Sequence, residues 1–98
     1  MNEAGNVNDP MSKYWLGQFH MTDQASSQVG CEDALIALKR HKNGDWGDVC
    51  PEDREANESA LANGGRLFSV YHTENGLKFW IITEADRNST TVLMPEDY

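Results

Sequence analysis

The strongest alternation of apolar and polar residues lies between Arg66 and Met94. Two runs rich in β-branched and aromatic residues flank the dipeptide Asn75-Gly76. Asn-Gly tolerates the positive φ that both central positions of a two-residue type I′ turn require, so this pattern predicts a β-hairpin. A second turn over Ala85–Ser89 and a third strand over Thr90–Met94, ended by Pro95, extend the hairpin into an antiparallel meander.

A turn at Asn75-Gly76 fixes the register, and with it the face on which each side chain lies. It places Tyr71 opposite Trp80, as an aromatic pair on a mixed face. Alternation then predicts one shared core face made of Phe68, Val70, Phe79 and Ile81.

Helical periodicity dominates the residues before the strands. Glu32–Lys42 has acids in its first turn and bases in its last, which suits the helix dipole. Its expected core stripe is Leu35 and Leu38, with Ala34 and Ala37 alongside and Ile36 widening it. A second helix is predicted over Pro51–Asn63, because proline fits its first position and Gly64-Gly65 its end. Thr22-Asp23 is expected to cap a short helix over Gln24–Val29.

Together these elements predict an α+β fold, a three-stranded antiparallel β-meander with two main helices packed on one face. One domain is expected over residues 13–98, because the chain has 98 residues. Residues 1–12 are polar and without periodicity, which predicts a disordered or loosely held tail. The aromatic segment Lys13–Met21 is expected to pack at an edge of the sheet.

The net charge of the chain limits the kinds of surface to which it is expected to bind. The formal net charge is −8, which disfavours direct binding to nucleic acid or membrane surfaces and favours basic protein surfaces. The N-terminus has neither the basic nor the apolar region of a secretion signal, and no apolar run is long enough to span a bilayer, so we expect a cytoplasmic protein. Cys31 and Cys50 match no metal-ligand spacing; we expect them to be reduced, with Cys31 a small buried residue, although a disulfide stays open.

The acidic loop and helix that precede the strands are the region that most strongly suggests a function. Its carboxylates are opposed only by Arg54, and helical spacing of three residues can align several of them on one face. Carboxylates in such a row can imitate the phosphates of a duplex, whereas the simpler interpretation is a solvated helix face. Trp46, bracketed by two glycines, is expected to fold back over the core; the alternative is a Trp presented to a partner.

Several segments together resemble a known family. They are Gly44-Asp45-Trp46-Gly47-Asp48, Glu52-Asp53-Arg54 with Asn57 and Ala60-Leu61, Gly65 to Tyr71, Trp80 to Arg87, Thr90-Thr91 and Leu93 to Tyr98. This set is similar to small proteins of bacterial plasmids, phages and other mobile elements, over roughly residues 34–98. The family has no established activity, so the resemblance implies a mobile-element setting. Asn88-Ser89 departs from the family pattern.

These observations lead to one principal functional hypothesis. The chain is expected to be a small acidic, non-enzymatic protein that binds and inhibits a basic, nucleic-acid-handling host protein, as an anti-CRISPR inhibitor or other DNA mimic does. No cofactor, metal site or catalytic residue is assigned. The predicted partner-binding residues are Asp45, Trp46, Asp48, Glu52, Asp53, Glu55, Glu58, Tyr71 and Trp80.

Two alternatives remain open at this point. A small hydrolase-type enzyme would use Glu84, Asp86 and Arg87 at the turn after the second strand, together with His72. A simpler interpretation has Asp86 capping the turn and Arg87 pairing with a carboxylate. The second alternative is a structural or regulatory protein that forms oligomers through the mixed sheet face, with Tyr71, Trp80 and Ile82 buried between chains.

Overall fold

The computed structural model describes residues 17–98, so the predicted tail and the start of the aromatic segment lie outside the described residues. The elements, in chain order, are β1 (Gln18–Met21), α1 (Asp23–Gln28), α2 (Cys31–Lys42), α3 (Pro51–Asn63), β2 (Leu67–His72), β3 (Lys78–Thr83), β4 (Ser89–Leu93) and the 3₁₀ turn η2 (Pro95–Asp97). The α+β class is confirmed, and so are the bounds of α3. Within residues 17–98, no helix is both long enough and apolar enough to cross a membrane.

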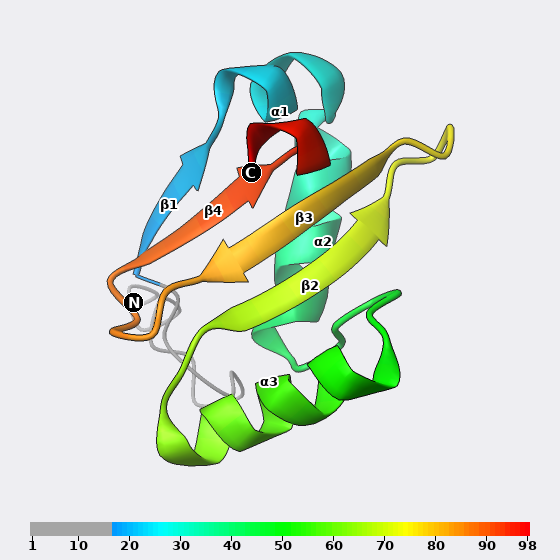
Figure 1. Cartoon of the computed structure of the whole chain (residues 1–98). Helices are drawn as coiled ribbons and strands as arrows, with labels where there is room; N and C mark the ends of the chain where they lie inside the picture. Colours follow the sequence, from blue (N-terminus) through cyan, green and yellow to red (C-terminus); the bar gives the residue numbers. More distant parts are fainter. Residues whose placement is uncertain (1–16) are drawn as a thin grey trace, which may run out of the picture.

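The sheet has four strands in the order β1-β4-β3-β2 (Figure 1). The meander of β2, β3 and β4 is antiparallel as predicted. The prediction of three strands was incomplete, because β1 joins the sheet as an edge strand parallel to β4. Four residues with a single apolar pair gave too short a pattern to distinguish a strand from a packed segment.

The predicted hairpin register was wrong by one residue. Val70 lies opposite Trp80 and Tyr71 opposite Phe79, so there is no Tyr71–Trp80 pair. The connection is longer than a two-residue turn: the Thr73 N–H donates to the Leu77 carbonyl at 2.8 Å, and the Thr73 hydroxyl accepts from the Leu77 N–H at 2.9 Å. A shift of one residue exchanges the two faces of one strand relative to the other.

The main core lies between the sheet and α2, which crosses behind the strands (Figure 1). The strands contribute Tyr71, Phe79, Ile81 and Val92, and the helices contribute Ala25, Ala34 and Ala37. Val29 directly after α1 and Met94 directly after β4 complete this buried set. Phe68 and Val70 lie on the opposite face, so the predicted core set was half right.

α2 meets the sheet through small side chains. Ala34, Ala37 and His41 are its buried residues, and alanines at this spacing let the helix approach the strands closely. The predicted stripe was wrong at Leu35 and Ile36, which are 59% and 57% exposed. Leu38 is partly buried against the core as expected.

α3 does not share that face with α2, which corrects the predicted arrangement of the two main helices. It runs along the outer side of β2 (Figure 1), with Asn57 and Ala60 buried. The Asn57 side-chain amide donates to the Phe68 carbonyl at 2.8 Å and accepts from the Phe68 N–H at 3.0 Å. One side chain thus takes the place of a neighbouring strand at this position.

The loop before α3 continues the same edge. The Val70 N–H donates to the Trp46 carbonyl at 3.1 Å, and the Asp48 N–H donates to the Val70 carbonyl at 2.9 Å. Gly47 lies between them with φ of 73°, and a Cβ there would come within 2.0 Å of the Val70 carbonyl oxygen. Only glycine permits this approach.

Candidate functional site

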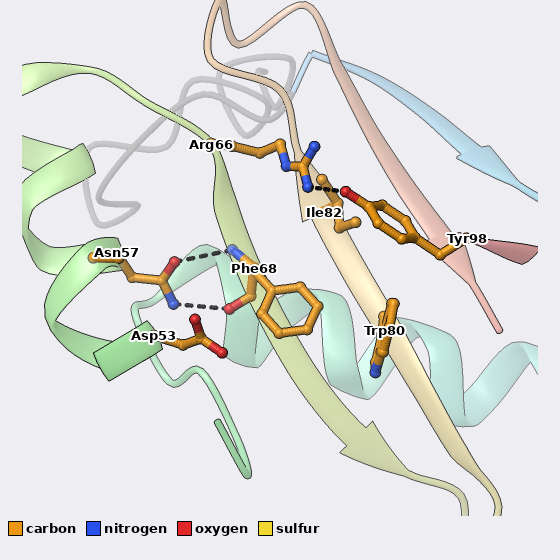
Figure 2. A pocket seen from close by; sticks show the side chains of 8 residues that line it. Asp53, Asn57, Arg66, Phe68, Trp80, Ile82 and Tyr98 are labelled. Carbon is orange, nitrogen blue, oxygen red and sulfur yellow. Dashed lines mark hydrogen bonds between the residues drawn. The ribbon is translucent and has the colours of Figure 1, made fainter. Parts of the chain in front are cut away.

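The face of the sheet away from α2 holds a groove of about 320 Å³. Figure 2 shows its floor of Phe68, Trp80 and Ile82, which come from β2 and β3. Side chains of α3 form one wall, and Arg66 and Tyr98 close the opposite end. The groove therefore joins three parts of the chain that are distant in sequence.

Aromatic rings run through the groove in edge contacts. Phe68 and Trp80 have ring centroids 5.1 Å apart at 79°, and Trp80 and Tyr98 are 5.7 Å apart at 69°. The Arg66 guanidinium carbon lies 5.5 Å from the Tyr98 ring centroid, and its Nη2 donates to the Tyr98 hydroxyl. Such edge contacts and cation–π contacts hold the rings in defined orientations.

Tyr98 depends on the anchoring of the η2 turn. The Asp97 carboxylate accepts from the Thr22 hydroxyl at 2.6 Å and from the Met94 N–H at 2.9 Å. These hydrogen bonds, that from Thr22 above all, lower the pKa of Asp97. The start of α1 thereby holds the last residues against the sheet.

Asp53 and Asn57, one helical turn apart, supply the polar groups of the α3 wall (Figure 2). Asn57 is committed to the backbone of Phe68. The half-buried Asp53 carboxylate has no hydrogen bond or ion pair to any part of residues 17–98. Asp53 is thus the anionic group of the groove that is available to a ligand.

Three of the predicted partner-binding acids have intramolecular partners. Asp45 pairs with Arg40 at 2.8 Å, and the hydrogen bond from Arg40 lowers the pKa of Asp45. Asp48 lies 3.1 Å from the His72 ring. Glu58 accepts from the Trp46 indole N–H at 2.9 Å. These carboxylates hold the loop and the helix in place.

Glu52 and Glu55 complete the set of predicted acids. Both are exposed, and neither has a hydrogen bond or ion pair to the described part of the chain. Together with Asp53, which lines the groove, they are three carboxylates on the first half of α3 without a partner within residues 17–98.

Trp46 and Tyr71 lie in the interior, only 1% and 2% exposed. The prediction that Trp46 folds back over the core is confirmed, and neither ring offers surface to a partner. The Tyr71 hydroxyl donates to the Asp45 carbonyl at 2.6 Å, and burial raises the pKa of Tyr71 well above its usual range. Of the predicted aromatic residues, Trp80 alone lines the groove.

The groups of the enzyme alternative do not converge. His72 ends β2 opposite Lys78, whereas Glu84 follows the other end of β3, about 20 Å away at the usual rise per strand residue. Arg87 donates instead to main-chain carbonyls, at 2.5 Å to Gly65 and 3.1 Å to Ala60. The expected carboxylate partner of Arg87 was therefore wrong.

Asp86 caps the turn as the simpler interpretation predicted. Its Oδ1 accepts from the Asn88 N–H at 2.9 Å, which is an Asx turn. Two of the three residues named for the oligomer alternative are already buried within one chain, because Tyr71 lies on the α2 face and Ile82 is 4% exposed.

A buried polar cluster lies on the α2 side of the sheet. His41 Nδ1 is 2.6 Å from the Ser69 hydroxyl and its Nε2 is 2.9 Å from the Thr83 hydroxyl. Burial, with a smaller effect from Arg87, lowers the pKa of His41 to about 3. This neutral, fully enclosed imidazole satisfies polar groups of the core and is closed to a substrate.

Cysteines and possible metal ligands do not add a site. Cys31 and Cys50 are free and exposed, so the expectation of a buried Cys31 was wrong. Residues 17–98 contain no group of three His, Cys, Asp or Glu side chains placed to hold a metal ion.

The sequence-based prediction missed Arg66, Phe68, Asn57, Ile82 and Tyr98 as residues of the groove. A correct register would have placed Phe68 beside Trp80. Tyr98 has no local signal, because its position depends on the contact between Asp97 and Thr22. Comparison of the chain with protein-family models, with curated proteins and with solved structures finds no match.

Proposed function

We propose that this chain is a non-enzymatic protein of a mobile element that binds and inhibits a basic, nucleic-acid-handling host protein. Counter-defence inhibition of the anti-CRISPR kind is the role we favour. The observation that supports it is the division among the acids: Asp45, Asp48 and Glu58 have partners, whereas Glu52, Asp53 and Glu55 have none within residues 17–98.

Unpaired carboxylates on a helix act beyond their immediate contacts. Residues three apart on a helix are neighbours at about 5–6 Å, which applies to Glu52 and Glu55. With a net charge of −8, the molecule attracts a basic surface over a Debye length and orients it during encounter. Such charges contribute to the association rate and to partner choice more than to the final affinity.

The test is a charge reversal limited to the two exposed acids that have no partner within residues 17–98. Glu52→Lys with Glu55→Lys leaves the contact between Glu58 and Trp46 intact. The matched control is Glu74→Lys with Glu84→Lys, which changes the net charge equally at exposed positions outside the first half of α3. Tagged protein is used to capture partners from cells that carry the element, and the captured protein is then produced for calorimetry at several salt concentrations.

The expected result is a basic nucleic-acid-handling protein that is captured by the parent chain and by the control, and lost by the α3 variant. Its affinity should fall steeply as salt increases, because exposed charge pairs are screened. Equal capture by both variants, or a flat salt dependence, would refute the electrostatic basis of the proposal.

A further inference from the structure

We propose that the groove between α3 and Tyr98 binds an arginine side chain of the partner, with Asp53 as its counter-ion. The proposal rests on the proposed function only for the partner being a basic protein. The binding chemistry is argued from the groove itself, whose lining combines an aromatic floor with a carboxylate that has no partner within residues 17–98.

The groove already shows that its rings accept a guanidinium. Arg66 stacks over Tyr98 at one end, with 5.5 Å from guanidinium carbon to ring centroid, and donates to the Tyr98 hydroxyl. This cation belongs to the end of the groove away from Asp53 (Figure 2). The Asp53 end offers ring surface and negative charge, and no lysine or arginine of residues 17–98 lines it.

The geometry at Asp53 is suited to a planar cation. Asn57 fixes the backbone of Phe68 on the adjacent strand, and the Phe68 ring is held at 79° to Trp80. A guanidinium that stacks on these rings can direct two N–H groups at one carboxylate, which is the bidentate arrangement that arginine favours. Because Asp53 is half-buried, a pair formed there is screened less than one on the open helix surface.

Charge and shape favour arginine over other occupants. A phosphate or carboxylate would face Asp53 and the neighbouring Glu52, so anionic ligands are disfavoured. Lysine carries a compact and strongly hydrated charge that does not stack as a plane. A neutral aromatic group would leave the Asp53 carboxylate unpaired in the complex, which costs affinity.

The test uses the full ¹⁵N-labelled chain and a defined probe, the peptide acetyl-Gly-Arg-Gly-amide. Its counterparts contain lysine or citrulline, the latter having the shape of arginine without its charge. The signals followed are the Trp80 indole N–H and the Asn57 side-chain amide, which lie at the floor and the wall of the groove. We expect saturable shifts of both signals with the arginine peptide, weaker binding of the lysine peptide, and citrulline binding about tenfold weaker, equivalent to 1.4 kcal/mol.

A pair of substitutions separates the groove from the general field of the acids. Asp53→Asn should weaken the arginine peptide about tenfold, the usual effect of losing one charge-assisted pair. Glu52→Gln, which removes one charge from the same turn of α3 outside the groove, should weaken it less than about twofold. Both variants are first checked for an unchanged spectrum in the core.

The outcomes distinguish this proposal from the proposed function. Equal binding of citrulline and arginine peptides, equal effects of the two substitutions, or shifts confined to the outer side of α3 would each overturn the groove site. A host protein that is captured through Glu52 and Glu55 while the peptide fails to bind would leave the proposed function standing. Conversely, peptide binding at the groove without charge-dependent capture would leave the groove site standing alone.

Discussion

The two faces of the sheet are formed by the same strands but differ in how fully their side chains are buried. On the α2 face, Tyr71, Phe79 and Ile81 are buried against Ala34 and Ala37. On the other face, Phe68 and Trp80 stay half-buried in a groove. Alternate positions of one hairpin therefore divide into a closed core and a surface whose cover is incomplete.

The polar groups of the two faces also differ in burial and in their hydrogen-bond partners. His41 is enclosed and both of its ring nitrogens have hydroxyl neighbours. Asp53 borders the groove without any partner within residues 17–98. The α2 face therefore encloses its polar groups with partners, whereas the groove face leaves one carboxylate, that of Asp53, without a partner within residues 17–98.

The largest effect expected is on the α2 face. Phe79→Ala removes a ring that is 1% exposed and should lower the free energy of unfolding by about 3–5 kcal/mol, measured by urea denaturation. Trp80→Ala, the next residue and on the other face, is the matched comparison and should cost less because its ring is half-buried. An equal loss for both would remove the distinction between the faces.

A second effect comes from the enclosed imidazole. The pKa of His41 falls from 6.5 to about 3 on folding, so the unfolded chain binds more protons between these values. Stability is therefore full above pH 6.5 and decreases as the pH falls. The free energy of unfolding should drop by about 2 kcal/mol between pH 6.5 and 4.5.

Two histidine variants test the origin of that slope. His41→Gln cannot titrate and should abolish it, whereas His72→Gln, at an exposed histidine, should preserve it. Denaturant curves at intervals of half a pH unit provide the measurement. A slope that survives in the His41 variant would assign it to other groups.

A smaller effect is expected where the two faces meet, at the edge covered by α3. Asn57→Ala leaves the Phe68 N–H and carbonyl without their side-chain partners and should cost about 1–3 kcal/mol. Ser59→Ala, on the exposed side of the same helix, controls for helix propensity. Hydrogen exchange of the Phe68 amide should accelerate in the Asn57 variant, and unchanged protection would argue against this role.

The smallest effect on stability is expected at Asp53, and it tests most directly whether the groove face differs from the α2 face. Asp53→Asn should change the free energy of unfolding by less than about 1 kcal/mol, because within residues 17–98 the stabilising interaction removed is that of a first-turn acid with the helix dipole. Thermal unfolding measures this directly. A larger loss would show that Asp53 supports the fold and would weaken its assignment as a binding group.

The sequence predicted the helices better than the sheet. Pro51 and Gly64 mark α3 through local backbone rules, and Thr22 caps α1 through its own hydroxyl, which accepts from the Ala25 N–H. The hairpin register failed because the Thr73 hydroxyl stabilises a longer connection, which competes with the two-residue turn expected at Asn75-Gly76. Local turn propensity does not include this competition.

The acidic positions of the candidate site were visible in the sequence, but their separation into paired and unpaired groups was not. Arg40 reaches Asp45, and His72 reaches Asp48 across the loop, which are tertiary contacts. Burial of Tyr71 and exposure of Leu35 likewise depend on which helix face meets the sheet. Hydrophobic periodicity reduces the number of helix faces that could meet the sheet, but it does not select one of them.

The attachment of α3 to β2 has a consequence for behaviour in concentrated solution. An outer strand with free main-chain groups is a template on which another chain can add, and this is a common start of aggregation. Here the Asn57 amide and the Trp46–Asp48 loop already occupy donors and acceptors of Phe68 and Val70. We therefore expect Asn57→Ala to reduce solubility as well as stability, since the freed edge can recruit strands from neighbouring molecules.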